Sequence, residues 1–332
     1  MQFKITLILP LILGILCQYA LANSITKPPL AQQQPLKPVA AVDLSPLKPD
    51  EQKTILEGRG KVNELLLNKN PEPVQLASAY GKLGNLYLIH ELYTSADACY
   101  DNAVLLHPDH FPWVYYSAYL AHKNGNMQEA LSGYKKAITL DPAYSAAKYR
   151  LALVYLDMNQ ADDAYTLFNS LLDTPEFMAA ANSGLGQVFL TKQQHPQAIE
   201  HFSRALEIQP SASKIHYPLA MALRASGQSQ EAKEHLKQFG KQDIIFKDPL
   251  VEALQALRNP ASRDFATAMT AVIKKNYARA ASEFGKGLEH EPDNSDARTS
   301  YARVLYLNEN KDDARSQLEL VTSKDPDKSL AL

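Results

Sequence analysis

The residues of this sequence that could do chemistry fall into a few short clusters. Residues 107–110, His-Pro-Asp-His, put two imidazoles and a carboxylate into one turn, a set that could ligate a metal ion. Two carboxylate pairs, Asp162 with Asp163 and Asp312 with Asp313, have the composition of an acid–base pair. Both pairs stand at an expected helix start, where negative charge complements the helix dipole. Residues 107–110 stand in an expected linker between helices. We therefore interpret all three clusters as helix-flanking residues.

No motif of catalysis or cofactor binding accompanies these clusters. The sequence contains no G-x-x-x-x-G-K-[ST], H-E-x-x-H, G-x-S-x-G or C-x-x-C, and residues 58–61, Gly-Arg-Gly-Lys, are too short for a phosphate loop. We therefore expect no enzyme, no cofactor and no metal site. The chain has 34 Lys and Arg against 36 Asp and Glu, so it lacks the basic field that binds nucleic-acid phosphates. Nucleic acid is not an expected partner.

Residues 1–22 have the pattern of a secretory signal peptide. A positive charge precedes a short apolar run, and small residues precede an expected cleavage site after Ala22. A proline and a glycine interrupt the run, which is shorter than the roughly 20 apolar residues of a membrane helix. We expect an exported protein of a bacterial periplasm with no stable membrane span; a lipid anchor at Cys17 and an uncleaved signal anchor are the alternatives. Cleavage would leave one cysteine, Cys99, which we interpret as a small residue packed in a helix.

The next two segments differ in composition. Residues 23–49 contain six prolines and a run of three glutamines, which predicts a flexible tether because too little apolar surface is present to fold. A proline-rich recognition peptide is the alternative. From Asp50 onward apolar residues recur at helical spacing, so residues 50–76 are predicted to form an N-terminal capping helix.

From about residue 77 the sequence repeats itself. Four prolines recur at intervals of about 34 residues and end successive units: Pro108, Pro142, Pro175 and Pro210. Before each proline an alanine is followed four positions later by a large aromatic residue: Ala96 and Tyr100, Ala130 and Tyr134, Ala164 and Phe168, Ala198 and Phe202. The alanine lets two helices approach closely, the ring fills the groove between units, and the proline ends the second helix. Three weaker copies follow.

This pattern resembles the tetratricopeptide repeat family, whose unit of about 34 residues is a helix-turn-helix. The resemblance covers about 77–328 and implies an all-α fold, a right-handed superhelix or α-solenoid of about seven helix-turn-helix repeats. Units one to five occupy 77–246, and units six and seven occupy 261–328. Residues 247–260 are extra and break the period. Because Asp248 before Pro249 favours a helix start, we predict an inserted helix there, or alternatively a hinge.

In this family the first helices of the units line a concave, ligand-binding face. Its contact positions fall in this chain on Tyr115, Tyr119, Tyr149, Leu153, Gln187, Tyr217, Met221 and Arg224. Tyrosine offers rigid contact area with a polar tip, which favours binding of a peptide segment of another protein. Packing of the tyrosines between units is the alternative. Some relatives grip a C-terminal carboxylate with several basic and amide side chains; only Asn85 and Arg150 stand near matching positions, so we expect no such grip.

These features together predict a non-catalytic protein–protein interaction scaffold of the cell envelope. The alternative is a structural subunit or accessory factor of an envelope assembly or export system, including polysaccharide or lipid export, that acts through the inserted helix and the C-terminal edge. Only six residues follow Pro326, so we expect the apolar edge of the last unit to be partly uncovered. An uncovered apolar edge favours self-association, so a homo-oligomer through this edge is a further expectation.

Overall fold

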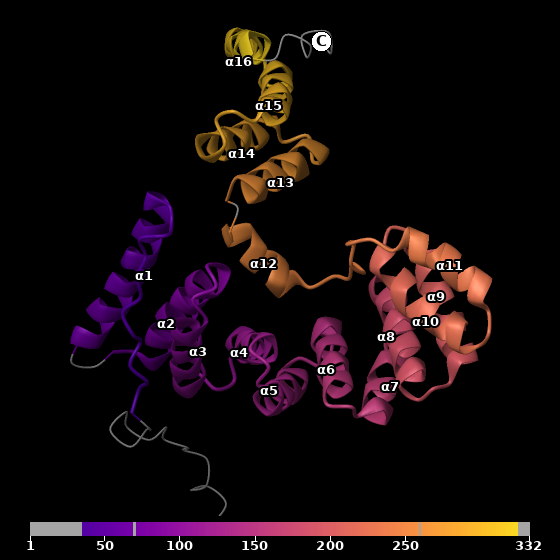
Figure 1. Ribbon diagram of the computed structural model, residues 1–332. Helices are drawn as coiled ribbons and strands as arrows, with labels where there is room; N and C mark the ends of the chain where they lie inside the picture. The colour runs from indigo at the N-terminus through magenta and orange to yellow at the C-terminus, as the bar shows by residue number, and fades with distance from the viewer. Residues whose placement is uncertain (1–34, 69–70, 259, 325–332) are drawn as a thin grey trace, which may run out of the picture. The chain divides into compact units, whose positions relative to one another are not determined.

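The described chain is built from α-helices joined in hairpins (Figure 1). The computed structural model describes residues 35–68, 71–258 and 260–324. These ranges hold sixteen α-helices and no strand: α1 (Pro49–Leu67), α2 (Pro73–Ile89), α3 (Tyr93–Leu106), α4 (Phe111–Lys123), α5 (Met127–Leu140), α6 (Ser145–Asp157), α7 (Ala161–Asn169), α8 (Met178–Thr191), α9 (His195–Ile208), α10 (His216–Ala225), α11 (Ser229–Gln238), α12 (Pro249–Arg258), α13 (Pro260–Ile273), α14 (Tyr277–His290), α15 (Ser295–Leu307) and α16 (Lys311–Lys324). The predicted all-α class is confirmed. The predicted signal peptide, 1–22, lies outside the described residues.

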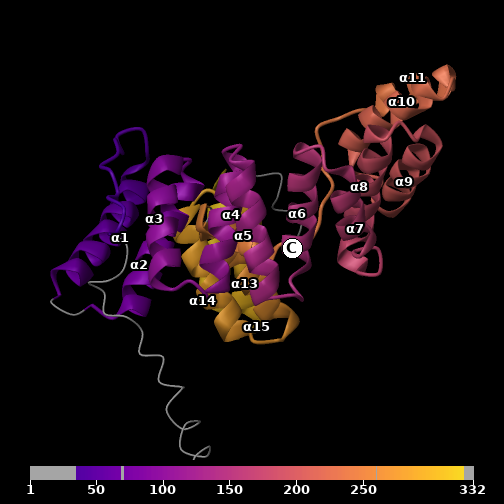
Figure 2. The same ribbon diagram turned by 90° about the horizontal axis from the view of Figure 1, so that it is seen from below.

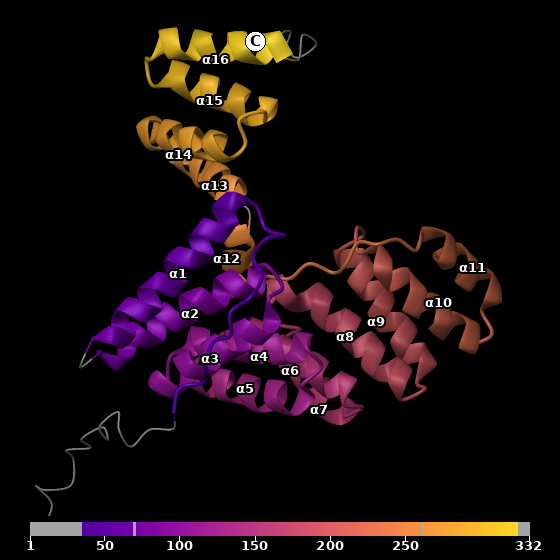
Figure 3. The same ribbon diagram turned by 60° about the vertical axis from the view of Figure 1, so that its left-hand side comes forward.

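Each repeat is a hairpin of two helices, and the hairpins pack in chain order as an α-solenoid. The hairpins are α2–α3, α4–α5, α6–α7, α8–α9, α10–α11, α13–α14 and α15–α16. Within α2–α11 and within α13–α16, the second helix of one hairpin packs on the first helix of the next, as for α3 on α4 in Figure 2 and α14 on α15 in Figure 3. Between these two stacks α13 contacts α12 of the insertion. Each unit therefore buries its apolar stripe against its neighbours, which is how repeat proteins build a core.

The turn inside each hairpin has one backbone conformation. A residue with positive φ follows the first helix at Glu91, Gly125, Asn159, Gln193, Gly227, Lys275 and Glu309. A left-handed residue at this position ends a helix and turns the chain back. Successive positions are separated by the repeat length, except that the step from Gly227 to Lys275 is longer. The excess in that step is the insertion that contains α12.

The predicted small and large residues of the repeat meet in the core. The alanines Ala96, Ala130, Ala164 and Ala198 are fully buried, as are the rings of Tyr100, Tyr134, Phe168 and Phe202. Glycines on the facing first helices leave room for these rings, because a Cβ on Gly84 would come within 2.9 Å of the Tyr100 ring. Close helix packing therefore rests on the absence of side-chain volume at a few positions.

Residues 37–48 have no helix and contact the first unit. The Lys37 N–H donates to Asn102 Oδ1 at 2.7 Å, and Asn102 Nδ2 donates to the Lys37 carbonyl at 2.8 Å. Arg59 of α1 donates to the Ala40 carbonyl at 3.2 Å. This part of the predicted tether is thus attached to α1 and α3, while residues 23–34 lie outside the described ranges. The predicted capping segment, 50–76, holds α1 and the start of α2.

We predict that Gly186→Ala destabilises the fold by about 1–3 kcal/mol, because a buried Cβ forced against a ring displaces well-packed neighbours. The new Cβ would lie 2.6 Å from the Phe202 ring. The free energy of unfolding, measured by urea denaturation, reports the change.

The matched control is Gly60→Ala in α1, where no heavy atom lies within 4 Å of the new Cβ. This exposed helical position should gain roughly 0.5–1 kcal/mol, since alanine loses less backbone entropy than glycine. Equal effects of the two substitutions would contradict the packing argument.

Candidate functional site: the first-helix face and the segment that covers it

All eight predicted groove residues lie on the first helices of their units. Tyr115 and Tyr119 are on α4, Tyr149 and Leu153 on α6, Gln187 on α8, and Tyr217, Met221 and Arg224 on α10. Their exposure divides the face into two parts. On α4 and α6 the rings of Tyr115 and Tyr149 are buried, whereas Gln187, Tyr217 and Arg224 on α8 and α10 are exposed. The other three, Tyr119, Leu153 and Met221, are half-buried.

A later part of the same chain covers the α4–α6 part of this face. After α11 ends at Gln238, residues 239–248 have no helix, and α12 follows (Figure 1). We call residues 246–254 the returning segment, because they contact α4 and α6 across 98 to 134 residues of sequence. Helix α12 also contacts α2, and Leu254 is its buried residue.

Asp248 is the central residue of this contact. Its Oδ2 accepts hydrogen bonds from the Tyr115 hydroxyl at 2.6 Å and from Arg150 Nε at 2.7 Å. Nη2 of Arg150 lies 2.6 Å from the same oxygen, and Oδ1 accepts from the Tyr144 hydroxyl at 2.9 Å. Asp248 is only 4% exposed. Burial of this carboxylate is therefore compensated by one cation and two neutral donors.

The main chain of the returning segment is bound as well. The Leu250 N–H donates to the Tyr144 hydroxyl at 3.0 Å, and the Tyr116 hydroxyl donates to the Leu250 carbonyl at 2.9 Å. The Val251 N–H donates to Asp248 Oδ1 at 3.3 Å, so the same carboxylate caps α12. One side chain thus ends the extended stretch, starts the helix and anchors both to the repeats.

Phe246 supplies an apolar anchor beside the carboxylate. Its ring centroid lies 4.4 Å from that of Tyr149 and 5.6 Å from that of Phe177. The Arg150 guanidinium lies over the rings of Phe246 and Tyr119, at 5.5 and 4.6 Å from their centroids. Tyr149 is therefore covered by an aromatic residue two positions before the anchoring aspartate.

The electrostatics of the site favour a bound anion and disfavour proton transfer. Burial raises the pKa of Tyr115 and Tyr144 far above that of a free phenol, and it raises the pKa of Tyr116 to about 12. These side chains remain neutral hydroxyl donors near neutral pH. Arg150 carries a permanent positive charge. The arrangement holds a carboxylate through one cation and neutral hydroxyl donors.

The predicted groove omits several residues of this contact, among them Tyr144, Arg150 and Phe246. The expected absence of a grip on a C-terminal carboxylate stays a prediction, yet Arg150 does hold a side-chain carboxylate that comes from within the chain. The helix start at Asp248 and Pro249 was the signal available in the sequence. No local pattern indicates that the partner of this aspartate lies on α6, 98 residues earlier.

The α8–α10 part of the face carries an exposed aromatic pair. The ring centroids of Tyr217 and Phe239 are 5.6 Å apart, and the two residues are 50% and 52% exposed. Arg224, further along α10, is exposed as well. This part offers an aromatic surface and a cation to solvent.

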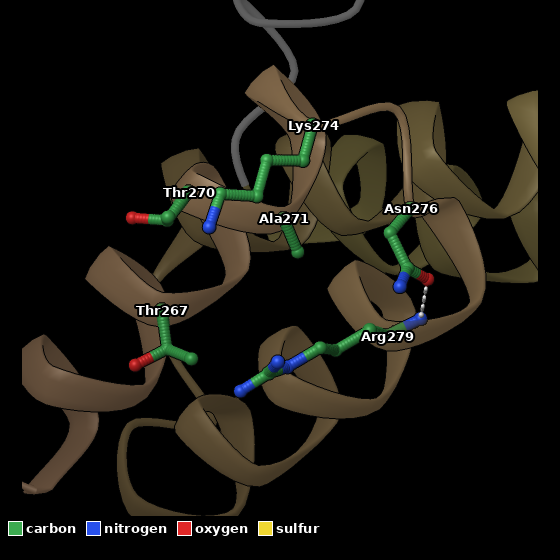
Figure 4. A pocket seen from close by; sticks show the side chains of 6 residues that line it. All are labelled: Thr267, Thr270, Ala271, Lys274, Asn276 and Arg279. Carbon is green, nitrogen blue, oxygen red and sulfur yellow. Dashed lines mark hydrogen bonds between the residues drawn. The ribbon is translucent and has the colours of Figure 1, made fainter.

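Other chemical groups in the described ranges serve local structure. A pocket of about 240 Å³ between α13 and α14 is lined by Thr267, Thr270, Ala271, Lys274, Asn276 and Arg279 (Figure 4). The two threonine hydroxyls donate to carbonyls one turn earlier in α13, and the Asn276 side chain caps α14. Burial raises the pKa of the Cys99 thiol to about 12, so little of it is thiolate at neutral pH.

Within the described part of the chain, no three or more His, Cys, Asp and Glu are grouped so that they could hold a metal ion. In the 107–110 cluster, His110 stacks on Trp113 with ring centroids 4.7 Å apart. A search of the described helices for one that is long and apolar enough to cross a membrane finds none.

Comparison with known proteins identifies the family. One tetratricopeptide repeat profile matches residues 121–176, 189–257 and 271–332, and a second matches 82–145 and 149–213. The chain belongs to the tetratricopeptide repeat family.

The relatives share the repeats at low identity. The chain is 25% identical to human tetratricopeptide repeat protein 7A over 134 residues, which are 40% of this chain and 16% of that protein. It is 32% identical over 83 residues to the TPR repeat-containing thioredoxin TTL4 of Arabidopsis thaliana, covering 25% of this chain and 12% of that protein. A solved tetratricopeptide repeat protein from Parabacteroides merdae has a TM-score of 0.52 at 15% identity and covers 78% of this chain and 92% of its own. This likeness shows the fold alone.

We predict that Asp248→Ala lowers the free energy of unfolding by about 3 kcal/mol, because the Arg150 cation then loses its buried partner. Arg150→Met should cost a similar amount. The double substitution should cost less than the sum of the two, since neither charge is then left unpaired. Urea denaturation of the four proteins measures the coupling.

The matched control is Asp243→Ala, in the same linker. Asp243 pairs with Lys214 at the surface, with both side chains about half or more exposed, so the loss should stay below about 1 kcal/mol. Additive effects at positions 150 and 248 would contradict the assigned ion pair.

Proposed function

We propose that this protein is a non-catalytic scaffold of the cell envelope that binds a segment of another protein on the first-helix face of its repeats. The observation that carries the proposal is the returning segment. The face of α4 and α6 holds a peptide through one carboxylate, one aromatic ring and main-chain hydrogen bonds. Aromatic anchors with a few positioned polar groups are what a peptide-binding surface needs. Membership of the tetratricopeptide repeat family supports a role in protein–protein interaction.

The external segment is proposed to bind on α8 and α10. Gln187, Tyr217 and Arg224 are exposed there, while the α4–α6 part is covered. Tyrosine and arginine are enriched among the residues that dominate binding energy, because each combines a large contact area with a polar group.

No catalytic role is part of this proposal. The buried hydroxyls around Asp248 have pKa values too high for acid–base work at neutral pH, and the Cys99 thiol is buried. The envelope location rests on the signal-like pattern of residues 1–22, which favours export to a periplasm.

The test is affinity capture from envelope extract with residues 23–332 as bait. The variant Tyr217→Ala with Arg224→Ala should retain about tenfold less of the partner than the unsubstituted protein, because one lost hot spot costs at least that much affinity.

The control replaces the same residue types on second helices: Tyr165→Ala in α7 with Arg204→Ala in α9, both exposed. It should retain the partner fully. Equal retention by all three baits would place the binding surface elsewhere and refute this part of the proposal.

A second candidate function is an assembly subunit that acts through its last hairpin. Tyr306 and Leu307 of α15 and Leu320 of α16 are 59%, 44% and 44% exposed. Exposed apolar side chains of this size favour contact with another surface, and a second copy of the chain is the simplest occupant.

We predict that Leu307→Glu with Leu320→Glu converts a dimer or larger species into single chains, because two charges cannot be buried in an apolar contact. Light scattering of the purified protein measures the mass. The matched control, Leu236→Glu with Leu257→Glu, changes two leucines of similar exposure on α11 and α12 and should leave the mass unchanged. Single chains in the unsubstituted protein at high concentration would exclude self-association.

A further inference from the structure

The side chains that donate to Asp248 all come from the repeats and none from the returning segment. Tyr115 comes from α4, Tyr144 immediately precedes α6, and Arg150 comes from α6 itself. Their own packing fixes them. The Tyr115 ring lies 5.2 Å from Tyr144 and 5.6 Å from Tyr134, and Arg150 lies over the ring of Tyr119. We call Tyr115, Tyr144 and Arg150 the carboxylate site, since the three donors converge on one carboxylate.

The α4–α6 face requires only a few particular side chains of the segment that it binds. Phe246 and Asp248 are the residues whose side chains enter the face, while Lys247 and Pro249 between and after them are exposed. Leu250 contributes its N–H and C=O, which any residue other than proline could supply. The recognised pattern is therefore an aromatic residue, one unspecified residue, and an aspartate that begins a helix.

The returning segment is held on α4 and α6 by few groups. The residues just before it bond elsewhere: the Ile245 N–H donates to Gln209 at 2.8 Å, and the Gln242 carbonyl accepts from the Lys214 N–H at 3.0 Å. Helix α12, which begins within the segment at Pro249, has a single buried residue, Leu254, among its ten. A segment held by one ring, one carboxylate, one leucine and two main-chain hydrogen bonds of Leu250 leaves its site at a lower cost than a core helix does.

We propose that the carboxylate site recognises an acidic segment of another protein that carries this aromatic-x-Asp pattern, and that the returning segment is its internal competitor. This inference rests on the proposed function and extends the binding face from α8–α10 to α4–α6. An acidic segment matches the charge of the site, because Arg150 is surrounded by neutral hydroxyls and its one positive charge pairs with one carboxylate. A covalently tethered competitor acts at an effective concentration of about millimolar, so only a segment that matches the pattern displaces it.

The test uses a fluorescein-labelled peptide of residues 243–254 as the probe and fluorescence anisotropy as the readout. The full chain is compared with the opened variant Phe246→Ala with Asp248→Lys, in which the internal segment no longer fits beside Arg150. The opened variant should bind the probe roughly a hundredfold more tightly than the unsubstituted chain, because the tethered competitor is gone.

Two controls separate recognition from general stickiness. A probe in which the residue corresponding to Asp248 is lysine should not bind the opened variant. Adding Arg150→Met to the opened variant should abolish binding of the original probe. Equal binding by the unsubstituted and opened chains, or binding that does not depend on Arg150, would overturn the proposal.

A second measurement does not depend on any variant folding. Excess unlabelled peptide is added to the unsubstituted chain, and hydrogen exchange of residues 246–254 is followed by mass spectrometry. Their amides should exchange faster with the original peptide than with the lysine version. Unchanged exchange would overturn the proposal, as would a dimer of the unsubstituted chain that the opened variant loses, because a second copy would then be the occupant. A partner still captured through Tyr217 and Arg224 would leave the proposed function standing.

Discussion

A carboxylate removed from water is stable only when a cation and hydrogen-bond donors replace its hydration, and Asp248 meets this condition through Arg150 and two tyrosines. The ion pair of Asp248 with Arg150 also matters for the architecture of the chain. In a solenoid each hairpin contacts its neighbours, so contacts between distant parts of the chain are scarce. The contact of Asp248 with Arg150 spans 98 residues of sequence and ties the insertion to the repeats.

The insertion is also the point where the period of the chain breaks. Hairpin turns recur at the repeat length up to Gly227, and the next turn, at Lys275, comes later than that period predicts. Without the closing proline of the other units, α11 runs into an extended stretch, and the additional chain provides the length for a second path across the first-helix face. The residues inserted between the repeats therefore supply a segment that binds to the repeats themselves.

Tyrosine serves this protein in two ways that follow from its structure. In the second helices of units one and two, Tyr100 and Tyr134 fill the space between helices as bulky core residues. On the first-helix face, Tyr115 and Tyr144 turn their hydroxyls toward a carboxylate while their rings pack on each other. A side chain with an apolar body and a polar tip can line a dry groove and still bind an anion. Such a face is selective for a segment that brings both an aromatic ring and a carboxylate. A segment with only one of the two would leave either the aromatic contact or the cation of the face without a partner.

The repeat and the features local to it could be predicted from the sequence: the helical hairpins, the alanine and aromatic pairs such as Ala198 and Phe202, and the family. The hairpins recur in every unit and the alanine–aromatic pairs in most of them, with leucine as the large residue at Leu236 and Leu318. They depend on neighbours within one or two turns, so a single sequence is enough to predict them. Which part of the first-helix face is open could not be predicted in this way, because it depends on contacts between residues far apart in the chain. Tyr115 and Tyr217 occupy equivalent kinds of position, yet one is buried and the other is half exposed. The Tyr115 ring packs on Tyr134 and Tyr144 and its hydroxyl donates to Asp248, whereas the Tyr217 ring contacts Phe239. The contact with Asp248 joins residues far apart in the chain, and no periodic pattern encodes a contact that occurs once.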